Sequence, residues 1–238
     1  GARRAGAFTL VITNTPGSSL TRDAHHTVLL HAKKERAVAA TKTYLAELVA
    51  MVMVCRALGG RGLTDADVAA LPDALRAALA CDPAIHDLAP SFRYAANAFC
   101  LARGFNFSTA REIALKLQET CYLKAEGMSA ADFLHGPIAM LDDMTPHLLF
   151  APAGPTAPFM LDLSRRLRKQ GTDVITFTNS PRLARAATSG IFCPLRISEG
   201  LSPLPLSLLG QLFACHLALA RGLNPDVPRR LTKVTRTL

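Results

Sequence analysis

The sequence predicts an α/β protein in which parallel sheets are covered by helices on both faces, and three observations support this. Short apolar runs that end in turn residues, such as 8–13 followed by Asn14-Thr15-Pro16-Gly17, alternate with segments of helical length. Alternation of strands with helices of this length is typical of parallel sheets. One strand–turn pattern occurs twice. Half of the 238 residues are hydrophobic, which excludes a disordered chain.

The repeated pattern predicts an internal duplication of one α/β unit. VITNTPGSSLTR (11–22) and ITFTNSPRLAR (175–185) share a strand, Thr-Asn, Pro and Leu-x-Arg. The segments that follow are a strand and a long apolar helix, at 27–31 and 40–57 in the first copy and at 191–197 and 203–221 in the second. A chance match between short patterns is the alternative, but the shared order of four elements favours duplication.

More elements precede the second copy than the first. They are a strand at 95–102, a helix at 108–120, a strand at 147–151, a helix at 157–170 and a strand at 173–178. Helical connections are predicted at 64–80 and 83–96. Because the chain begins on the third strand of the first unit, we expect the N-terminal half of that unit to be absent.

The positive charge lies at the two ends of the chain. Residues 1–60 carry 8 basic and 3 acidic side chains, residues 61–220 carry 14 of each, and residues 221–238 carry 5 and 1, within a total of +9. Net charge alone is the argument for nucleic-acid binding, because no recognition-helix pattern accompanies it. We therefore expect no nucleic-acid partner.

Membrane insertion and metal binding are not expected either. The longest apolar stretches, 45–55 and 212–220, contain Glu47 and His216 and are much shorter than the ~18 apolar residues that a membrane span needs. The six cysteines form no C-x-x-C pair and are interpreted as reduced core residues of a cytoplasmic protein. The pair His25-His26 has no carboxylate or thiol at ligand spacing, so surface histidines are expected.

The most informative stretch is 109–137, TAREIALKLQETCYLKAEGMSAADFLHGP. Glu112, Lys116 and Glu119 are spaced i, i+4 and i+7, so that all three project from one helix face. A lysine between two carboxylates can tune proton affinities, and a carboxylate near it at a strand's carboxyl end is a candidate proton shuttle. The alternatives are a capping box from Thr109 to Glu112 and an ordinary surface ion pair from Glu112 to Lys116.

Two further side chains suit general acid–base or nucleophilic chemistry. His135 precedes Gly136-Pro137, so a turn could present its imidazole, although a polar turn residue has the same pattern. Lys233 lies in the basic tail PRRLTKVTRTL, for which a solvated terminus is the alternative.

Three blocks give the chain a resemblance to the sugar isomerase (SIS) family, within it most closely to the isomerase half of glucosamine-6-phosphate synthases. They are VAATKTYLAEL (38–48), REIALKLQETCYLKAEGMSAADFLHGPIAML (111–141) and PLSLLGQLFACHLALARGLNPDVPRRLTKV (205–234). The resemblance implies tandem flavodoxin-like units. The expected division is the C-terminal half of a first SIS unit (1–62), a helical connection (63–92), a second SIS unit (93–222) and a C-terminal tail (223–238).

The resemblance also implies a role for each matching residue. Glu119 corresponds to the carboxylate that moves a proton between C1 and C2 of an open-chain sugar phosphate. His135 corresponds to a ring-opening histidine that reaches the partner subunit's site, and Lys233 to the lysine that forms a Schiff base with the ketose. The residues that match substrate-binding positions are Glu112, Lys116, Val38, Ala40, Thr41 and Lys42. A homodimer is implied, with no metal and no organic cofactor.

Three departures limit what carries over. The family's Ser-x-Ser-Gly phosphate loop belongs to the half-unit expected before Gly1, the serine usual in the VAATK block is Ala40, and no glutaminase domain is present. The expected function is therefore a phosphosugar aldose–ketose isomerase, or a deaminase or aminotransferase-type enzyme for amino-sugar phosphates, acting on a hexose 6-phosphate without glutaminase activity. A sugar-phosphate-binding regulatory module is the alternative.

Overall fold

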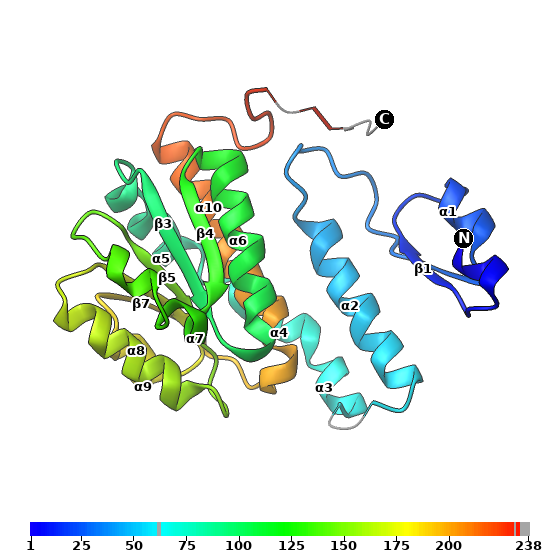
Figure 1. The fold of residues 1–238 in the computed structure, drawn as a ribbon, viewed down its shortest axis with the longest axis horizontal. Helices are drawn as coiled ribbons and strands as arrows, with labels where there is room; N and C mark the ends of the chain where they lie inside the picture. Colours follow the sequence, from blue (N-terminus) through cyan, green and yellow to red (C-terminus); the bar gives the residue numbers. More distant parts are fainter. Residues whose placement is uncertain (61–62, 231, 234–238) are drawn as a thin grey trace.

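A computed structural model describes residues 1–60, 63–230 and 232–233 of the chain (Figure 1). Its larger sheet has five parallel strands in the order β4-β3-β5-β6-β7. The strands are β3 (Asn97–Ala102), β4 (Lys124–Ser129), β5 (His147–Phe150), β6 (Val174–Thr178) and β7 (Ser189–Phe192). The predicted parallel α/β architecture is confirmed.

Helices cover both faces of this sheet, because alternate residues of its strands supply two separate apolar clusters. Cys100, Phe150 and Phe177 face one cluster, and Leu101, Leu149 and Val174 face the other. The first cluster is covered by α4 (Leu71–Leu79), α5 (Asp82–Leu88), the 3-10 helix η2 (Ala89–Phe92), α6 (Phe107–Cys121) and α10 (Pro203–Ala220). The second is covered by α7 (Ala130–Phe133), α8 (Ala157–Lys169) and α9 (Pro181–Ala186).

The N-terminal region forms a smaller unit of the same kind. Strands β1 (Leu10–Thr13) and β2 (His26–Leu29) pair in parallel, with α1 (Ser19–Asp23) between them and α2 (Lys42–Ala57) after them. The order strand, short helix, strand, long helix is repeated by β6, α9, β7 and α10. The structure therefore bears out the duplication. In Figure 1, α2 lies between the β1–β2 pair and the helices of the larger sheet.

The connection between the units is helical, as predicted, and contains α3 (Asp65–Ala69), α4, α5 and η2. Leu48, Val49 and Val52 of α2 pack with Leu71 of α4 and Leu204 of α10 in a third apolar cluster. The remaining short 3-10 helices are η1 (Ala2–Ala5), η3 (Gly104–Asn106), η4 (Pro137–Met140) and η5 (Glu199–Leu201).

Two strands differ from the sequence prediction. The strand expected at 191–197 ends at Phe192, and Pro194 lacks the backbone N–H that a longer pairing would use. Strand β4 was not predicted, because KAEGMS carries two charged residues and a glycine and lies at the sheet edge, where alternate side chains are exposed. A Cβ on Gly127 would lie 2.5 Å from the Ala110 carbonyl oxygen, so this glycine lets α6 approach the strand closely.

Helix α10 is long and apolar enough to cross a membrane by length and composition, but 67% of it is buried inside the protein. It packs against α6, α4 and α5, and Gly210 allows its backbone to meet the Ile113 side chain. These contacts are those of the central core helix of an α/β domain.

Candidate functional site

The three charged side chains of α6 form one buried cluster. The Lys116 ammonium donates a 2.6 Å hydrogen bond to Glu119 Oε2 and lies 3.8 Å from Glu112 Oε1. The side chains of Lys116, Glu112 and Glu119 are 5%, 10% and 24% exposed. The prediction that they share one face is confirmed, and the alternative of an ordinary surface ion pair is wrong.

The capping-box alternative is wrong as well, because α6 begins two residues before Thr109. Helix α6 starts at Phe107 after Asn106, and the buried Thr109 hydroxyl donates to the Asn106 side chain at 3.1 Å. Glu112 is consequently a helix-interior residue that the fold holds beside Lys116.

Burial changes the proton affinity of Glu112. Removal from water raises its pKa to about 7, and the opposing effects of Lys116 and the Gln211 side chain do not restore the ordinary value. The Oε1 atom of Glu112 has no hydrogen-bond partner within the described residues. The cluster therefore contains a carboxyl group that exchanges a proton near neutral pH, beside an ammonium that is paired with a second carboxylate.

A small cavity lies against Lys116 of this cluster. Its volume is about 180 Å³, and its lining residues are Ala37, Ala39, Thr41, Lys116, Thr120, Gln211, Ala214, Cys215, Pro225 and Asp226. These residues come from the segment before α2, from α6, from α10 and from the tail. The fold thus brings the three sequence blocks together at one place.

The segment 38–42 divides into residues that face the cavity and residues that do not. Thr41 lines the cavity, and its carbonyl oxygen accepts a 3.5 Å hydrogen bond from Gln211 Nε2. Val38 and Ala40 are half-buried, and the Val38 amide donates to the Asp226 carbonyl oxygen at 3.0 Å. Lys42 is exposed and its ammonium donates to the Lys34 carbonyl oxygen at 2.7 Å, so its charge is directed away from the cavity.

Lys233 lies next to the same segment. Its ammonium donates to the carbonyl oxygens of Ala37 at 2.5 Å and of Val38 at 3.4 Å. Ala37 also lines the cavity that contains Lys116. The tail therefore folds back across the segment before α2, and the solvated-terminus alternative does not describe Lys233, although its side chain is exposed.

His135 lies away from the cluster within one chain. It follows α7 at the carboxyl edge of β4, whereas Glu119 is in the last turn of α6, which ends beside the start of β4 (Figure 1). Six residues of strand separate the two edges by roughly 20 Å. The expectation that Glu119 lies at a strand's carboxyl end is therefore wrong, because α6 runs antiparallel to the strands. His135 is exposed.

Two contributors to the site were not found from the sequence. Gln211 is a buried amide in the apolar helix α10, and its isolation among apolar residues is the signal that could have identified it. Glu35 accepts hydrogen bonds from the backbone of Thr41 and from the backbone and hydroxyl of Thr43 at 3.3, 3.0 and 2.6 Å. Although partial burial raises the pKa of Glu35, these hydrogen bonds lower it below its ordinary value. Glu35 thereby fixes the start of α2.

Cysteines and histidines form no metal centre in the described part of the chain. No group of three or more His, Cys, Asp or Glu side chains is placed to hold a metal ion there. All six cysteines are free, four are buried and Cys215 is half-buried, whereas Cys55 is exposed and does not fit the expectation of a core residue. His25 and His26 are exposed, as predicted.

The duplicated parallel α/β fold and the buried Lys–carboxylate cluster define the class of protein, and comparison with known proteins gives the family. The SIS domain family matches residues 2–57 and 91–221. The chain belongs to the SIS domain family.

Curated relatives and solved structures agree with this assignment. The chain is 35% identical to a glutamine–fructose-6-phosphate aminotransferase (isomerizing) of Pyrococcus horikoshii over 98% of its own length, and spans 40% of that relative. The C-terminal domain of the Francisella tularensis glucosamine-fructose-6-phosphate aminotransferase superposes with a TM-score of 0.80 and 25% identity, covering 95% of this chain and 68% of that one. Escherichia coli tagatose-6-phosphate ketose/aldose isomerase, at 22% identity, shares the fold with a TM-score of 0.76 over 93% and 63% of the two chains.

Proposed function

We propose that this chain carries the active site of an aldose–ketose isomerase or amino-sugar-phosphate deaminase for a hexose 6-phosphate of the fructose 6-phosphate or glucosamine 6-phosphate class. The observation that carries the proposal is the buried Glu112–Lys116–Glu119 cluster. Its Lys116 lines a cavity of about 180 Å³, and so does Ala37, whose carbonyl oxygen accepts a hydrogen bond from Lys233. The substrate class is supported by the relatives, which are named as aminotransferases of fructose 6-phosphate.

Glu119 is the proposed base that moves a proton between C1 and C2. Isomerisation through an enediol needs one base that reaches two adjacent carbons, and a carboxylate at a helix end, paired with a lysine that lines a cavity, suits that task. Lys116 holds Glu119 by a 2.6 Å hydrogen bond and brings positive charge to the place where an oxyanion develops. Glu112, with its pKa raised to about 7, is the neighbouring group that can hold a proton at neutral pH.

Lys233 is the proposed nucleophile toward the ketose. Its amine adds to the C2 carbonyl and water leaves, so that an imine forms and makes the protons on C1 more acidic. The hydrogen bonds to the Ala37 and Val38 carbonyl oxygens hold the ammonium beside the segment that lines the cavity.

His135 is the proposed ring-opening acid, supplied by the partner subunit of a homodimer. Within one chain it follows the end of β4 that lies opposite Glu119, and this separation supports its supply by a second copy. A soluble, cytoplasmic homodimer that binds neither nucleic acid nor membrane is part of this proposal.

Borohydride trapping tests the proposal directly. The protein is incubated with fructose 6-phosphate, reduced with borohydride and digested, and the peptides are measured by mass spectrometry. We expect a reduced sugar adduct on Lys233, and none in the Lys233→Arg variant. Lys42→Arg is the matched control, because Lys42 belongs to the same region but directs its ammonium toward Lys34. The control should keep the adduct.

Kinetics with Glu119→Gln separate catalysis from binding. The adduct on Lys233 should still form, whereas interconversion of the aldose and ketose should fall by about 10²–10⁴-fold. Saturable sugar-phosphate binding by the unmodified protein, with neither adduct nor turnover, would contradict the catalytic proposal and favour the regulatory module instead.

A further inference from the structure

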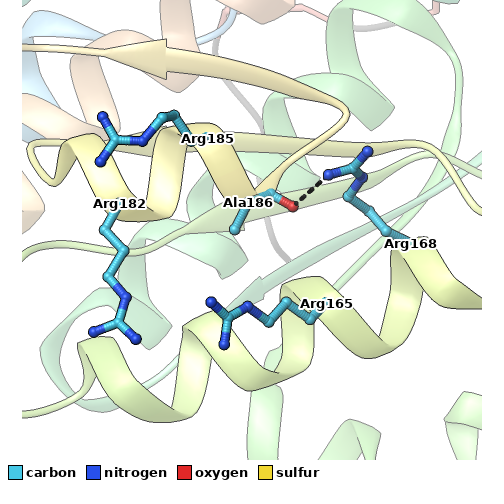
Figure 2. Close-up of a pocket in the computed structure, with 5 residues that line it drawn as sticks. All are labelled: Arg165, Arg168, Arg182, Arg185 and Ala186. Atoms are coloured by element: carbon cyan, nitrogen blue, oxygen red, sulfur yellow. Dashed lines mark hydrogen bonds between the residues drawn. The ribbon is translucent and has the colours of Figure 1, made fainter.

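We propose that a pocket between α8 and α9 binds an anion that carries two or more phosphate groups. The pocket has a volume of about 340 Å³ and is lined by Arg165 and Arg168 of α8 and by Arg182, Arg185 and Ala186 of α9 (Figure 2). This inference does not depend on the proposed function, because α8 and α9 cover the face of the sheet opposite to α6 and its cluster.

Two helices contribute the four arginines to one depression of the surface. Figure 2 shows the Arg165 and Arg182 side chains extending into the space between the helices, while Arg168 turns toward the end of α9. Arg168 donates to the Ala186 carbonyl oxygen at 3.3 Å, which fixes the spacing of α8 and α9. Within residues 1–60, 63–230 and 232–233, the guanidinium groups of the other three arginines form no hydrogen bond or ion pair that would direct their donors elsewhere.

Local charge is strongly unbalanced at this place. Residues 61–220 carry equal numbers of basic and acidic side chains, yet the segment from α8 to α9 has Arg165, Arg166, Arg168, Lys169, Arg182 and Arg185 against Asp162 and Asp173. Asp162 pairs with Arg166 at 2.7 Å. In the described part of the chain, none of the four pocket arginines has a carboxylate partner. Four like charges repel one another unless an anion offsets them.

The chemistry of the pocket selects a compact, highly charged ligand. Guanidinium groups bind phosphate oxygens through two parallel hydrogen bonds, and four of them supply more donors than a single phosphate can accept. A diphosphate group has the charge and oxygen count to match. The lining holds no aromatic side chain on which a nucleic-acid base could stack, which disfavours a single-stranded nucleic acid.

Isothermal titration with inorganic diphosphate tests the proposal, with ADP as a second probe that presents a diphosphate group on a nucleoside. We expect saturable binding of diphosphate at about 0.1 M salt and weaker binding of orthophosphate. The double variant Arg165→Gln/Arg182→Gln should weaken diphosphate binding by about tenfold or more, since hydrogen bonds between charged partners contribute more than about 1.4 kcal/mol each.

The matched control is Arg4→Gln/Arg76→Gln, which removes two exposed positive charges away from the pocket. It should bind diphosphate as the unmodified protein does, and thermal melting checks that both double variants are folded. Tighter binding of ADP than of diphosphate, lost in the pocket variant, identifies a nucleotide as the source of the phosphates. Equal loss in both double variants, absence of saturable binding, or binding of an oligothymidylate that diphosphate does not displace would overturn the proposal.

Discussion

The two α/β units share one order of elements but differ in how their sheets are buried. In the larger unit every residue of β5 and β6 is buried, whereas in the smaller unit no residue of β1 or β2 is fully buried. Parallel strands are normally covered on both faces. Within the described residues, β1 and β2 pair only with each other, and Leu48, Val49 and Val52 of α2 pack toward α4 and α10.

The two units therefore contribute differently to the stability of the protein and to its candidate site. The larger unit holds most of the apolar core, while the smaller unit supplies the segment 37–41 that lines the cavity next to Lys116. The two copies of the pattern therefore contribute differently to stability. The burial of each copy's side chains, and not the pattern itself, determines how much they add to the free energy of unfolding.

The largest effect is expected from truncating one isoleucine in each unit. Ile175 of β6 is fully buried, so Ile175→Ala should lower the free energy of unfolding by about 3–4 kcal/mol. Ile12 of β1 is half-exposed, so Ile12→Ala should cost about 1 kcal/mol. Urea denaturation followed by circular dichroism measures both. Equal losses would mean that the sheet of the smaller unit is buried as deeply as that of the larger one.

Much of the fold could be predicted from the sequence, for reasons that the two units make clear. Central strands such as β5 and β6 are continuous apolar runs because both of their faces are buried, and this signal is strong. Edge strand β4 has no such continuous apolar run, because Lys124 and Glu126 face solvent. The end of β7 depends on Pro194, whose effect on pairing becomes clear only when the neighbouring strand is known.

The candidate site was predictable where its residues share one element. Glu112, Lys116 and Glu119 are on one helix, so helical spacing brings them together. Contacts between distant segments could not be derived in this way. Gln211 with Thr41, and Lys233 with Ala37, meet only because α10 and the tail fold against the segment before α2. Lys233 was predicted from the resemblance to the SIS family. Gln211 had one local signal, its isolation in an apolar helix, and Glu35 had none.

Acid should destabilise the larger unit through one buried histidine. His147 at the start of β5 is buried between Phe99 and Phe133, with ring centroids 5.4 and 5.7 Å away, and burial lowers its pKa to about 4. The unfolded chain, with an ordinary histidine pKa near 6.5, binds more protons below that pH. The larger unit should therefore lose up to about 3 kcal/mol of stability as pH falls from 6.5 to 4.

His147→Leu isolates that contribution. The variant keeps an apolar side chain at the site, so its stability should change less between pH 6.5 and 4 than that of the unmodified protein, as measured by urea denaturation at each pH. The histidines of the smaller unit, His25 and His26, are exposed, and His26→Gln is the matched control that should leave the slope unchanged. Identical slopes for all three proteins would rule out His147 as the source.

Effects smaller than those at Ile175 and His147 are expected at the starts of two helices, one in each unit. Glu35 caps the start of α2 with three hydrogen bonds from Thr41 and Thr43, and Ser180 caps α9 with one bond of 3.4 Å from the Leu183 amide. Glu35→Ala should lower the free energy of unfolding by about 1–2 kcal/mol and Ser180→Ala by about 0.5–1 kcal/mol, because the carboxylate also interacts with the helix dipole.

The two caps should also differ in their dependence on pH. Since the pKa of Glu35 is lowered in the folded protein, its contribution is present above pH 4.5 and disappears as the carboxylate is protonated at lower pH. The contribution of Ser180 does not change with pH. Hydrogen exchange of the first amides of α2 and α9 at pH 7 and pH 4 measures both contributions locally. A pH-independent effect of Glu35→Ala would show that this side chain acts through packing, and not as a charged cap.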